Sequence, residues 1–293
     1  MRRLIALIAF ITTVCVTVPL LGTPGIGDIP AVTVGKVDHS FNPADGKIFI
    51  LVIGNDARAG NPDASRADAM HIVGINTKTM KAGILNFPRD CWVNVPGHGS
   101  MKMNEALYAG GPDLLVQTLE GVTGIKLDYW VMTGFMGFRR IVRDLNGVKV
   151  NVPYDIVDPG GSGANLRKGP QTLNPDTALA FTRARKTLPN GDIDRSTNQG
   201  RFLLALLRDL QSDVAANPGA VFKWLAIGRK WTRLDLPPDE LYKLAVLATQ
   251  VKMKEVRAET VPVSLGAVGA ASVVFISSGA QSLYRKFERT GTL

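Results

Sequence analysis

The stretch that decides the fold is Lys47-Ile-Phe-Ile-Leu-Val-Ile-Gly-Asn-Asp56, in which a continuous apolar run ends at a turn-forming pair and an aspartate. Unbroken apolar runs rich in β-branched residues are typical of strands that are covered on both faces of a sheet. Two similar runs follow at 71–75 and 82–87, and charged or turn-forming residues border each of them. These runs predict the centre of one sheet.

Outward from this centre, helical and extended patterns alternate along the chain. We expect helices at 104–108, 112–122, 135–144, 178–185, about 194–211 and 280–287, and further strands at 128–133, 148–152, 255–262 and 271–277. Such alternation favours helices on both faces of a sheet, so the predicted fold class is an α/β/α sandwich with a central mixed β-sheet. With 293 residues and 45% apolar content, the chain can form one large domain, which we place at 46–288 with a tail at 289–293.

The N-terminus carries a separate signal. Met1-Arg-Arg3 precedes an apolar stretch at 4–21 that is long enough, as a helix, to cross a thin bilayer. The two arginines place the N-terminus in the cytoplasm. We therefore expect a transmembrane helix within 1–22, a tether at 23–45, and a single-pass protein of the cell membrane whose folded domain is extracellular. A cleaved secretory signal peptide is the competing interpretation, although no clear cleavage site follows.

Under either interpretation the folded domain is exported, which limits the classes of partner that it can meet. The net charge of +9 suits nucleic acid, an anionic membrane surface or a polyphosphorylated ligand. Nucleic acid is disfavoured because the domain faces outward and has no recognisable docking motif. Cys15 lies in the apolar stretch and leaves Cys91 alone outside it, so we expect no disulfide in the exported part.

Arginine and aspartate recur together along the chain, and several of these groups adjoin predicted strands. They occur as Asp56-Ala-Arg58, Arg66-Ala-Asp68, Arg89-Asp90, Arg183-Ala-Arg185 and Asp192-Ile-Asp-Arg195. Guanidinium groups bind phosphate oxygens in bidentate fashion, whereas spaced carboxylates suit a hard divalent cation. If the strands beside Asp56 and Asp68 are antiparallel neighbours, the groups meet at one edge of the sheet and predict a metal-assisted diphosphate site. Solvated surface ion pairs are the alternative for any single group.

These groups, in this order and together with Lys102-Met-Asn-Glu-Ala106, resemble the motif set of the LytR-CpsA-Psr family. Members of that family attach cell-wall polymers to peptidoglycan in Gram-positive bacteria. The resemblance implies a phosphotransferase that moves a glycopolymer from a polyprenyl diphosphate carrier to a muramic acid hydroxyl and releases the carrier. The implied partners are the lipid-linked glycan, peptidoglycan and the membrane.

The resemblance also implies roles for individual residues. A divalent cation, Mg²⁺ or Mn²⁺, would bind Asp56 and Asp68, and these two residues with Arg89 would be catalytic. The diphosphate would be held by Arg66, Arg89, Lys102, Arg183, Arg185, Arg195 and Gln199, with Arg58, Asp90 and Asp192 in support. Metal and guanidinium groups would stabilise the charge of the leaving group. The base that deprotonates the hydroxyl stays open among Asp56, Asp68, Asp90 and Asp192.

One position departs from the family pattern D-x-x-R-x-x-R-Q. The chain has Asn198 at the second arginine, and Arg201, about one helical turn further on, is the candidate to compensate. Cys91 has no visible base nearby, so we expect a small structural residue there rather than a nucleophile.

Two other function classes remain open at this point. One is a non-catalytic polyanion-binding or regulatory envelope protein, and the other is a polyprenyl diphosphate phosphatase, in which water is the acceptor. Carboxylates that face the ligand favour an enzyme, since a pure polyanion binder gains nothing from them. A polyprenyl chain also needs an apolar groove, for which 203–210, 221–227 and 241–251 are the candidates, with ordinary core packing as the alternative.

Overall fold

The structure is a computed structural model, and it describes residues 32–36, 45–57, 65–234 and 238–293. No helix within these residues is both long and apolar enough to cross a membrane. The predicted anchor at 1–22 and Arg58 lie outside the described residues.

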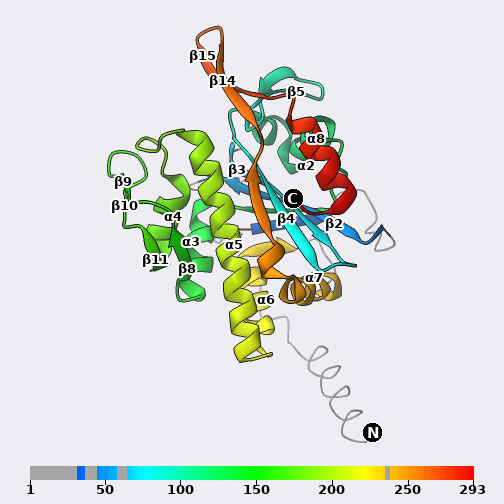
Figure 1. Cartoon of the computed structure of the whole chain (residues 1–293), viewed down its shortest axis with the longest axis vertical. Helices are drawn as coiled ribbons and strands as arrows, with labels where there is room; N and C mark the ends of the chain where they lie inside the picture. The colour runs from blue at the N-terminus through cyan, green and yellow to red at the C-terminus, as the bar shows by residue number, and fades with distance from the viewer. Residues whose placement is uncertain (1–31, 37–44, 58–64, 235–237) are drawn as a thin grey trace, which may run out of the picture.

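A mixed sheet forms the centre of the described fold (Figure 1). Its strands lie in the order β12-β1-β7-β2-β3-β4-β13. β2 pairs antiparallel with β3 and parallel with β7, and β3 pairs antiparallel with β4. The three apolar runs of the sequence are thus confirmed as adjacent central strands. The strands are β1 (Val32–Lys36), β2 (Lys47–Asn55), β3 (Ala67–Asn76), β4 (Lys81–Phe87), β5 (Trp92–Val95), β6 (Gly99–Lys102), β7 (Tyr129–Thr133), β8 (Val148–Val152), β9 (Ile156–Asp158), β10 (Ala164–Leu166), β11 (Gly169–Leu173), β12 (Thr232–Leu234), β13 (Arg257–Thr260), β14 (Val263–Val268) and β15 (Ala271–Ile276).

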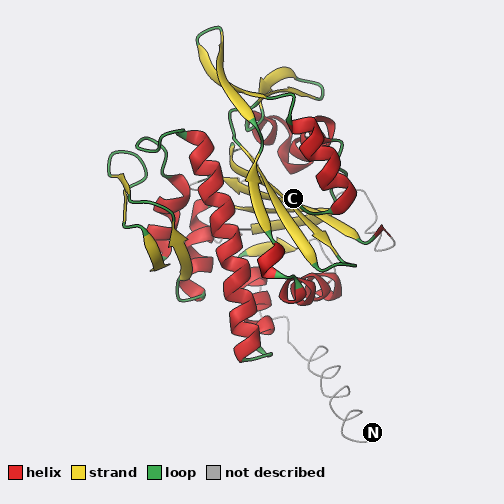
Figure 2. Cartoon of the chain, viewed as in Figure 1, coloured by secondary structure: helices red, strands yellow, loops and turns green. Residues whose placement is uncertain are grey.

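Helices cover both faces of this sheet (Figure 2), as the predicted α/β/α arrangement requires. On one face, α2 and α8 bury Leu119 and Phe287 against β2 and β3. On the other face, α5 and α7 place Leu207 and Leu247 beside Ile75. The helices are α2 (Glu105–Thr123), α3 (Phe135–Asp144), α4 (Pro175–Arg183), α5 (Asp192–Ala216), α6 (Ala220–Lys230), α7 (Pro238–Gln250), the 3-10 helix η3 (Met253–Glu255) and α8 (Ala280–Thr290).

A second core lies beside the sheet and supports the arginine-bearing helices. Alternate residues of β8 are buried, and they pack with Phe181 of α4 and Phe202 of α5. Because α5 contributes to this core and to the one over the sheet, it is fixed between the two layers.

Several elements differ from the sequence expectation. Within the stretch expected to be a tether, Val32–Lys36 forms β1 and pairs with both β7 and β12. Its Val-Thr-Val pattern is short, and the Gly and Pro residues around it obscured it. The expected helices at 104–108 and 112–122 are joined as α2 with a kink at Gly110 and Gly111, where Gly111 has φ 72°. Residues expected to be a tail continue α8 to Thr290, and Leu293 packs against the core.

Candidate active site

A β-bulge places Asp68 in the site. Gly54 of β2 pairs with Ala69 of β3, and Asn55 pairs with Ala67, so Asp68 has no residue opposite it. Ala67 and Met70 face the core under α2, whereas Asp68, Ala69 and His71 line a pocket on the other side. Simple alternation would have turned Asp68 towards the core. The bulge therefore re-aims its carboxylate into the pocket.

Asp56 and Arg66 close the loop that joins β2 to β3. The Asp56 amide donates to the Arg66 carbonyl at 3.2 Å, and the Arg66 amide donates to Asp56 Oδ1 at 3.0 Å. The Arg66 guanidinium is 60% exposed and lies 3.8 Å from Glu105. The structure thus confirms that the strands beside Asp56 and Asp68 are antiparallel neighbours, and it places the Arg66 side chain towards α2.

Arg89 is the centre of the charged cluster. Its guanidinium donates to Asp68 Oδ1, and its Nε lies 3.6 Å from Asp192 and 3.9 Å from Asp90. Lys102 Nζ lies 3.3 Å from Asp90. Burial alone would lower the pKa of Arg89, but the Asp68 and Asp192 carboxylates outweigh it and raise that pKa above the ordinary value. Arg89 is therefore a permanent cation held by three aspartates.

The short segment before α2 holds the two strand ends together. The Asn104 amide donates to the Arg89 carbonyl, and the Ala67 amide donates to the Asn104 carbonyl, at 3.1 and 3.2 Å. These bonds fix the distance between the Arg89 backbone and the start of β3. Asn104 is also the N-cap residue of α2, but its side chain makes no capping hydrogen bond.

The two arginines after Phe181 leave the helix in different directions. α4 ends at Arg183, and Ala184 has an extended backbone with ψ 130°. Arg183 lies over the Phe135 ring, 4.7 Å from its centroid, while Arg185 Nη1 lies 3.8 Å from Asp192. Asp158, which no sequence motif marked, accepts a hydrogen bond from the Arg185 amide at 3.2 Å. The extended exit from α4 therefore directs Arg183 to Phe135 and Arg185 to Asp192.

The first turns of α5 complete the cluster. Arg195 Nη2 lies 2.8 Å from Asp192 Oδ1, and Gln199 Nε2 donates to the carbonyls of Thr182 and Asp68 at 3.0 and 3.3 Å. Gln199 therefore ties α5 to both α4 and the bulge. Burial lowers the pKa of Arg195, and the nearby cations Arg89 and Arg185 add to this effect.

Two guanidinium donors of this cluster have no hydrogen-bond partner within the described part of the chain. They are Nε of Arg89 and Nε of Arg195, and both are buried. Leaving buried donors unsatisfied costs about 1–3 kcal/mol each. The arrangement is therefore suited to an anionic ligand that would occupy the donors.

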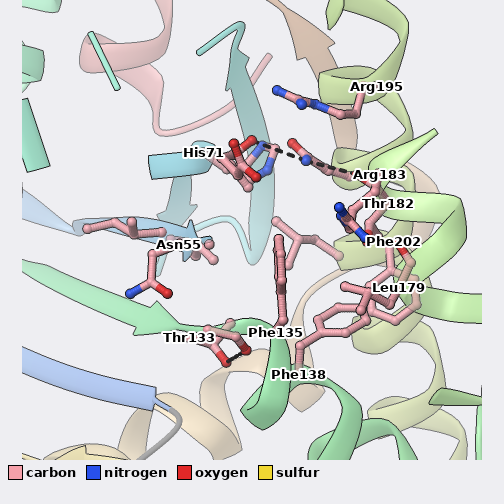
Figure 3. Close-up of a pocket in the computed structure, with 18 residues that line it drawn as sticks. Asn55, His71, Thr133, Phe135, Phe138, Leu179, Thr182, Arg183, Arg195 and Phe202 are labelled. Atoms are coloured by element: carbon pink, nitrogen blue, oxygen red, sulfur yellow. Dashed lines mark hydrogen bonds between the residues drawn. The ribbon is translucent and has the colours of Figure 1, made fainter. Parts of the chain in front are cut away.

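An apolar pocket adjoins the cluster (Figure 3). It encloses about 620 Å³ of empty space, part of it open to solvent, between the sheet and helices α3, α4 and α5. Phe135, Phe138 and Phe202 gather at one end, and Arg195 lies at the other (Figure 3). Asp68, Arg183, Arg195 and Gln199 belong to its lining, so the charged cluster and the apolar walls share one cavity.

The sequence located this pocket only in part. Of the stretches 203–210, 221–227 and 241–251, Leu203 alone lies among the lining residues. Residues of 203–210 and 241–251 pack in cores over the sheet instead. In 221–227, Val221 and Ile227 are buried away from the pocket. The lining residues that the sequence missed include Asn55, His71, Thr133, Phe135, Phe138 and Thr182. The spacing of Phe135 and Phe138 on an expected helix was the available signal.

Asn198 and Arg201 interact with each other. Arg201 Nη1 donates to Asn198 Oδ1 at 2.7 Å, and Asn198 is fully buried. Arg201 forms no ion pair with any described residue and is not among the residues that line the pocket, and its role as a substitute for the arginine absent at Asn198 stays a prediction.

Cys91 is buried and reduced, and burial raises the pKa of its thiol to about 12. The expectation that it is not a nucleophile agrees with this environment.

The carboxylates near the bulge fit a divalent cation in a limited way. No cluster of three or more His, Cys, Asp or Glu side chains able to hold a metal occurs among the described residues. Asp56 Oδ1 accepts a hydrogen bond from the Arg66 amide, and Asp68 Oδ1 accepts one from the Arg89 guanidinium. The Oδ2 atoms of both aspartates are therefore the donors to a cation. Mg²⁺ is commonly bound by one or two protein carboxylates together with water and substrate phosphates. These donors therefore suit an Mg²⁺ ion that the protein shares with its substrate, rather than one enclosed by protein ligands alone.

The fold and this cavity define a class of α/β protein with an arginine–carboxylate cluster at the mouth of an apolar pocket. The LytR_cpsA_psr family model matches residues 30–287. The chain belongs to the LytR-CpsA-Psr family.

Individual relatives agree with this assignment. The polyisoprenyl-teichoic acid–peptidoglycan teichoic acid transferase TagT of Bacillus subtilis (strain 168) is 39% identical over 176 residues, which cover 57% of this chain and 54% of TagT. The regulatory protein MsrR of Staphylococcus aureus (strain COL) is 31% identical over 232 residues, 77% of this chain and 68% of MsrR. A solved structure of TagT bound to LI-WTA has a TM-score of 0.69 at 26% identity and covers 92% of this chain and 100% of that chain. The aligned sequence spans about half the length of TagT.

Proposed function

We propose that this chain is a phosphotransferase that moves a glycopolymer from a polyprenyl diphosphate carrier to the muramic acid hydroxyl of peptidoglycan. The observation that carries the proposal is the shared cavity. Asp68, Arg183 and Arg195 line the apolar pocket and also belong to, or adjoin, the buried charged cluster. A diphosphate joined to a long apolar chain needs both environments at once. The name of the relative TagT, a teichoic acid transferase, supports the same substrate class.

In the proposed reaction, the acceptor oxygen attacks the glycan-linked phosphorus. A new P–O bond forms, the P–O–P bond to the carrier breaks, and polyprenyl phosphate leaves with the electron pair. Arg89, Arg195 and Arg185 are the cations placed to hold the diphosphate and stabilise its growing charge. A divalent cation on Asp56 and Asp68 would add Lewis-acid stabilisation of the same oxygens.

The acceptor proton must pass to a base. Asp68, Asp90 and Asp192 all surround Arg89, and Asp56 lies beside the bulge, where it is hydrogen-bonded to the Arg66 amide. The four carboxylates therefore remain the candidates, and single Asp→Asn substitutions compared by pH–rate profile would separate them.

Two alternatives use the same residues. The name of the relative MsrR, a regulatory protein, favours a polyanion-binding role without turnover. A polyprenyl diphosphate phosphatase differs from the proposal only in using water as the acceptor. The three aspartates around Arg89 support an enzyme, since carboxylates facing an anionic ligand weaken simple binding.

The test uses the full chain in detergent with a polyprenyl-diphosphate glycan, Mg²⁺ and peptidoglycan. The proposal expects polyprenyl phosphate to be released only when peptidoglycan is present, with the glycan found in the wall fraction. Release without acceptor would establish the phosphatase, and binding without release would establish the polyanion binder. Release of polyprenyl diphosphate would show cleavage of the sugar C–O bond instead.

A further inference from the structure

A cluster of basic side chains surrounds one tryptophan at the end of α3, outside the proposed active site. Around the Trp231 ring lie Arg140 Cζ at 4.6 Å, Lys230 Nζ at 5.0 Å and Arg143 Cζ at 5.7 Å from the centroid. Trp231 Nε1 donates to Asp144 at 2.7 Å. We call Arg140, Arg143, Asp144, Lys230 and Trp231 the Trp231 cluster.

Two cations of this cluster are exposed. Arg143 and Lys230 are 57% and 63% exposed, and both lie within 4.0 Å of Asp144, which is only 20% exposed. Arg229, next in the chain, is exposed and forms no ion pair with any described residue. The cluster thus presents positive charge to solvent over an indole ring, a combination that binds anionic surfaces.

An exposed aromatic pair lies between α6 and α7. Phe222 and Tyr242 stack with centroids 5.9 Å apart, and they are 56% and 43% exposed. Phe222 and Arg229 are seven residues apart on α6 and so share one helix face. An exposed phenylalanine contributes no charge that would attract the phosphates of a soluble polyanion. It adds affinity when the anion belongs to a bilayer, whose interface accepts aromatic rings beside basic side chains.

The position of β1 relates this surface to the expected anchor. Val32 pairs with Thr232, the residue after Trp231, and also with Thr133, which lines the pocket. Residues 22–31 separate Val32 from the apolar stretch at 4–21, and a fully extended chain of that length spans about 35 Å. An anchor in that stretch would therefore enter a bilayer within about 35 Å of Val32.

The pocket lies one helix length away from the Trp231 cluster. α3 begins at Phe135 in the pocket and ends at Asp144 in the cluster, and a helix of ten residues is about 15 Å long. A bilayer in contact with the Trp231 cluster therefore lies within reach of the pocket.

We propose that the Trp231 cluster, with Arg229 and Phe222, seats the folded domain on the anionic headgroups of a phospholipid bilayer. This inference goes beyond the proposed function, because the charged site around Arg89 does not include these residues. The seat would hold the pocket next to the leaflet that carries a polyprenyl-linked substrate.

The test places the full chain in nanodiscs of phosphatidylglycerol or of phosphatidylcholine. Amine acylation followed by mass spectrometry reports the accessibility of Lys230, and Lys286, which is exposed on α8, serves as the internal control. Lys230 is expected to be labelled several-fold more slowly in phosphatidylglycerol, with Lys286 unchanged. Equal labelling of Lys230 in the two lipids would overturn the proposal.

Matched double variants sharpen this test. R143Q/R229Q removes two cations beside the reporter Lys230, and R285Q/R289Q removes two beside the reporter Lys286. Each cation near an anionic surface changes the membrane-binding equilibrium about five-fold. The first variant should therefore lower the ratio of seated to unseated protein about 25-fold, while the second leaves Lys230 protected. Should R143Q disturb folding through Asp144, R229Q alone keeps the test intact, with about a five-fold effect.

Two further controls separate the explanations. Protection of Lys230 that appears in phosphatidylcholine discs only after addition of a soluble glycerol-phosphate polymer would assign the cluster to polymer instead and overturn the membrane seat. Turnover in detergent should be the same in both double variants and the wild type. Absence of turnover in the wild type would refute the proposed function while leaving the labelling result to decide the seat.

Discussion

Arg89 and Asp68 are joined by an ion pair that runs from the end of β4 to the bulge of β3. The two side chains are only 19% and 17% exposed, so water screens the pair weakly. Asp68 is held from the other side as well, because Gln199 donates to its carbonyl. The backbone at the bulge is thus fixed independently of the carboxylate charge, which allows the charge to be removed alone.

We expect D68N to lower the rate of glycan transfer by about 10²–10³-fold, the usual loss when one preorganised electrostatic group is removed. Asparagine keeps the shape and an acceptor for Arg89, so the unfolding temperature should change little. The measurement is release of polyprenyl phosphate together with thermal unfolding. D176N removes an exposed carboxylate from α4 and serves as the control. Turnover near the wild-type level in D68N would remove Asp68 from the mechanism.

The sequence predicted the sheet well and the site only in outline. Apolar runs located β2, β3 and β4 because strands buried on both faces need them, and α3 was found with its observed bounds, 135–144. The bulge at Asp68 depends on pairing between two strands, which no local pattern records. Most of the pocket lining was missed for a similar reason, since Thr133 and Phe135 reach it only because β7 lies beside β2. The motifs therefore identified the charged residues, whereas tertiary pairing determined which of them meet.

The donors at Asp56 and Asp68 predict a dependence on divalent metal. Chelation should abolish transfer, and Mg²⁺ or Mn²⁺ should restore it. D56A removes one of two carboxylates and should raise the Mg²⁺ concentration for half-maximal activity by about 10–100-fold, the range found when ligand support is lost. Titration calorimetry of Mg²⁺ in the presence of a diphosphate provides a reading that does not depend on turnover. Full activity in chelator would contradict the assignment.

The apolar pocket should be blocked by a larger side chain at Leu179, which lines it from α4. L179W is expected to weaken binding of a polyprenyl diphosphate by at least about ten-fold, because the indole occupies space that the chain needs. M136W places the same side chain at an exposed position of α3, 54% accessible and absent from the lining, and should bind normally. Equal affinity in both variants would place the lipid elsewhere. Fluorescence titration with the unlinked carrier measures the effect.

Cys91 should be dispensable for the chemistry. Its thiol is buried, and desolvation raises its pKa to about 12, with the carboxylates of Asp192 and Asp90 adding to the effect, so it is protonated at neutral pH. C91A is expected to retain most of the turnover and to lose about 1 kcal/mol of unfolding free energy, as for a small buried truncation. Iodoacetamide should react slowly with the native wild type and rapidly once it is unfolded. Loss of turnover in a folded C91A protein would reverse this conclusion.

His71 should make the domain less stable in mild acid. Burial lowers its pKa from 6.5 to about 4, although the hydrogen bond with Asn86 opposes this. The unfolded chain takes up a proton near pH 6.5, whereas the folded chain resists until about pH 4. Stability from this residue is therefore complete above pH 6.5 and is lost as pH falls towards 4, by about 3 kcal/mol in all.

The comparison is with H71Q, which does not titrate. Urea unfolding at several pH values should show the wild type losing its advantage over H71Q between pH 6.5 and 4, because only the wild type gains a proton on unfolding in that range. Acidic groups also titrate in this range. For Asp158, burial would raise the pKa, but backbone hydrogen bonds from Arg185 and Ser162 lower it. Such groups contribute equally to both proteins, so they cancel in the difference. Parallel stability curves for the two proteins would show that His71 is not held neutral between the pocket and Asn86.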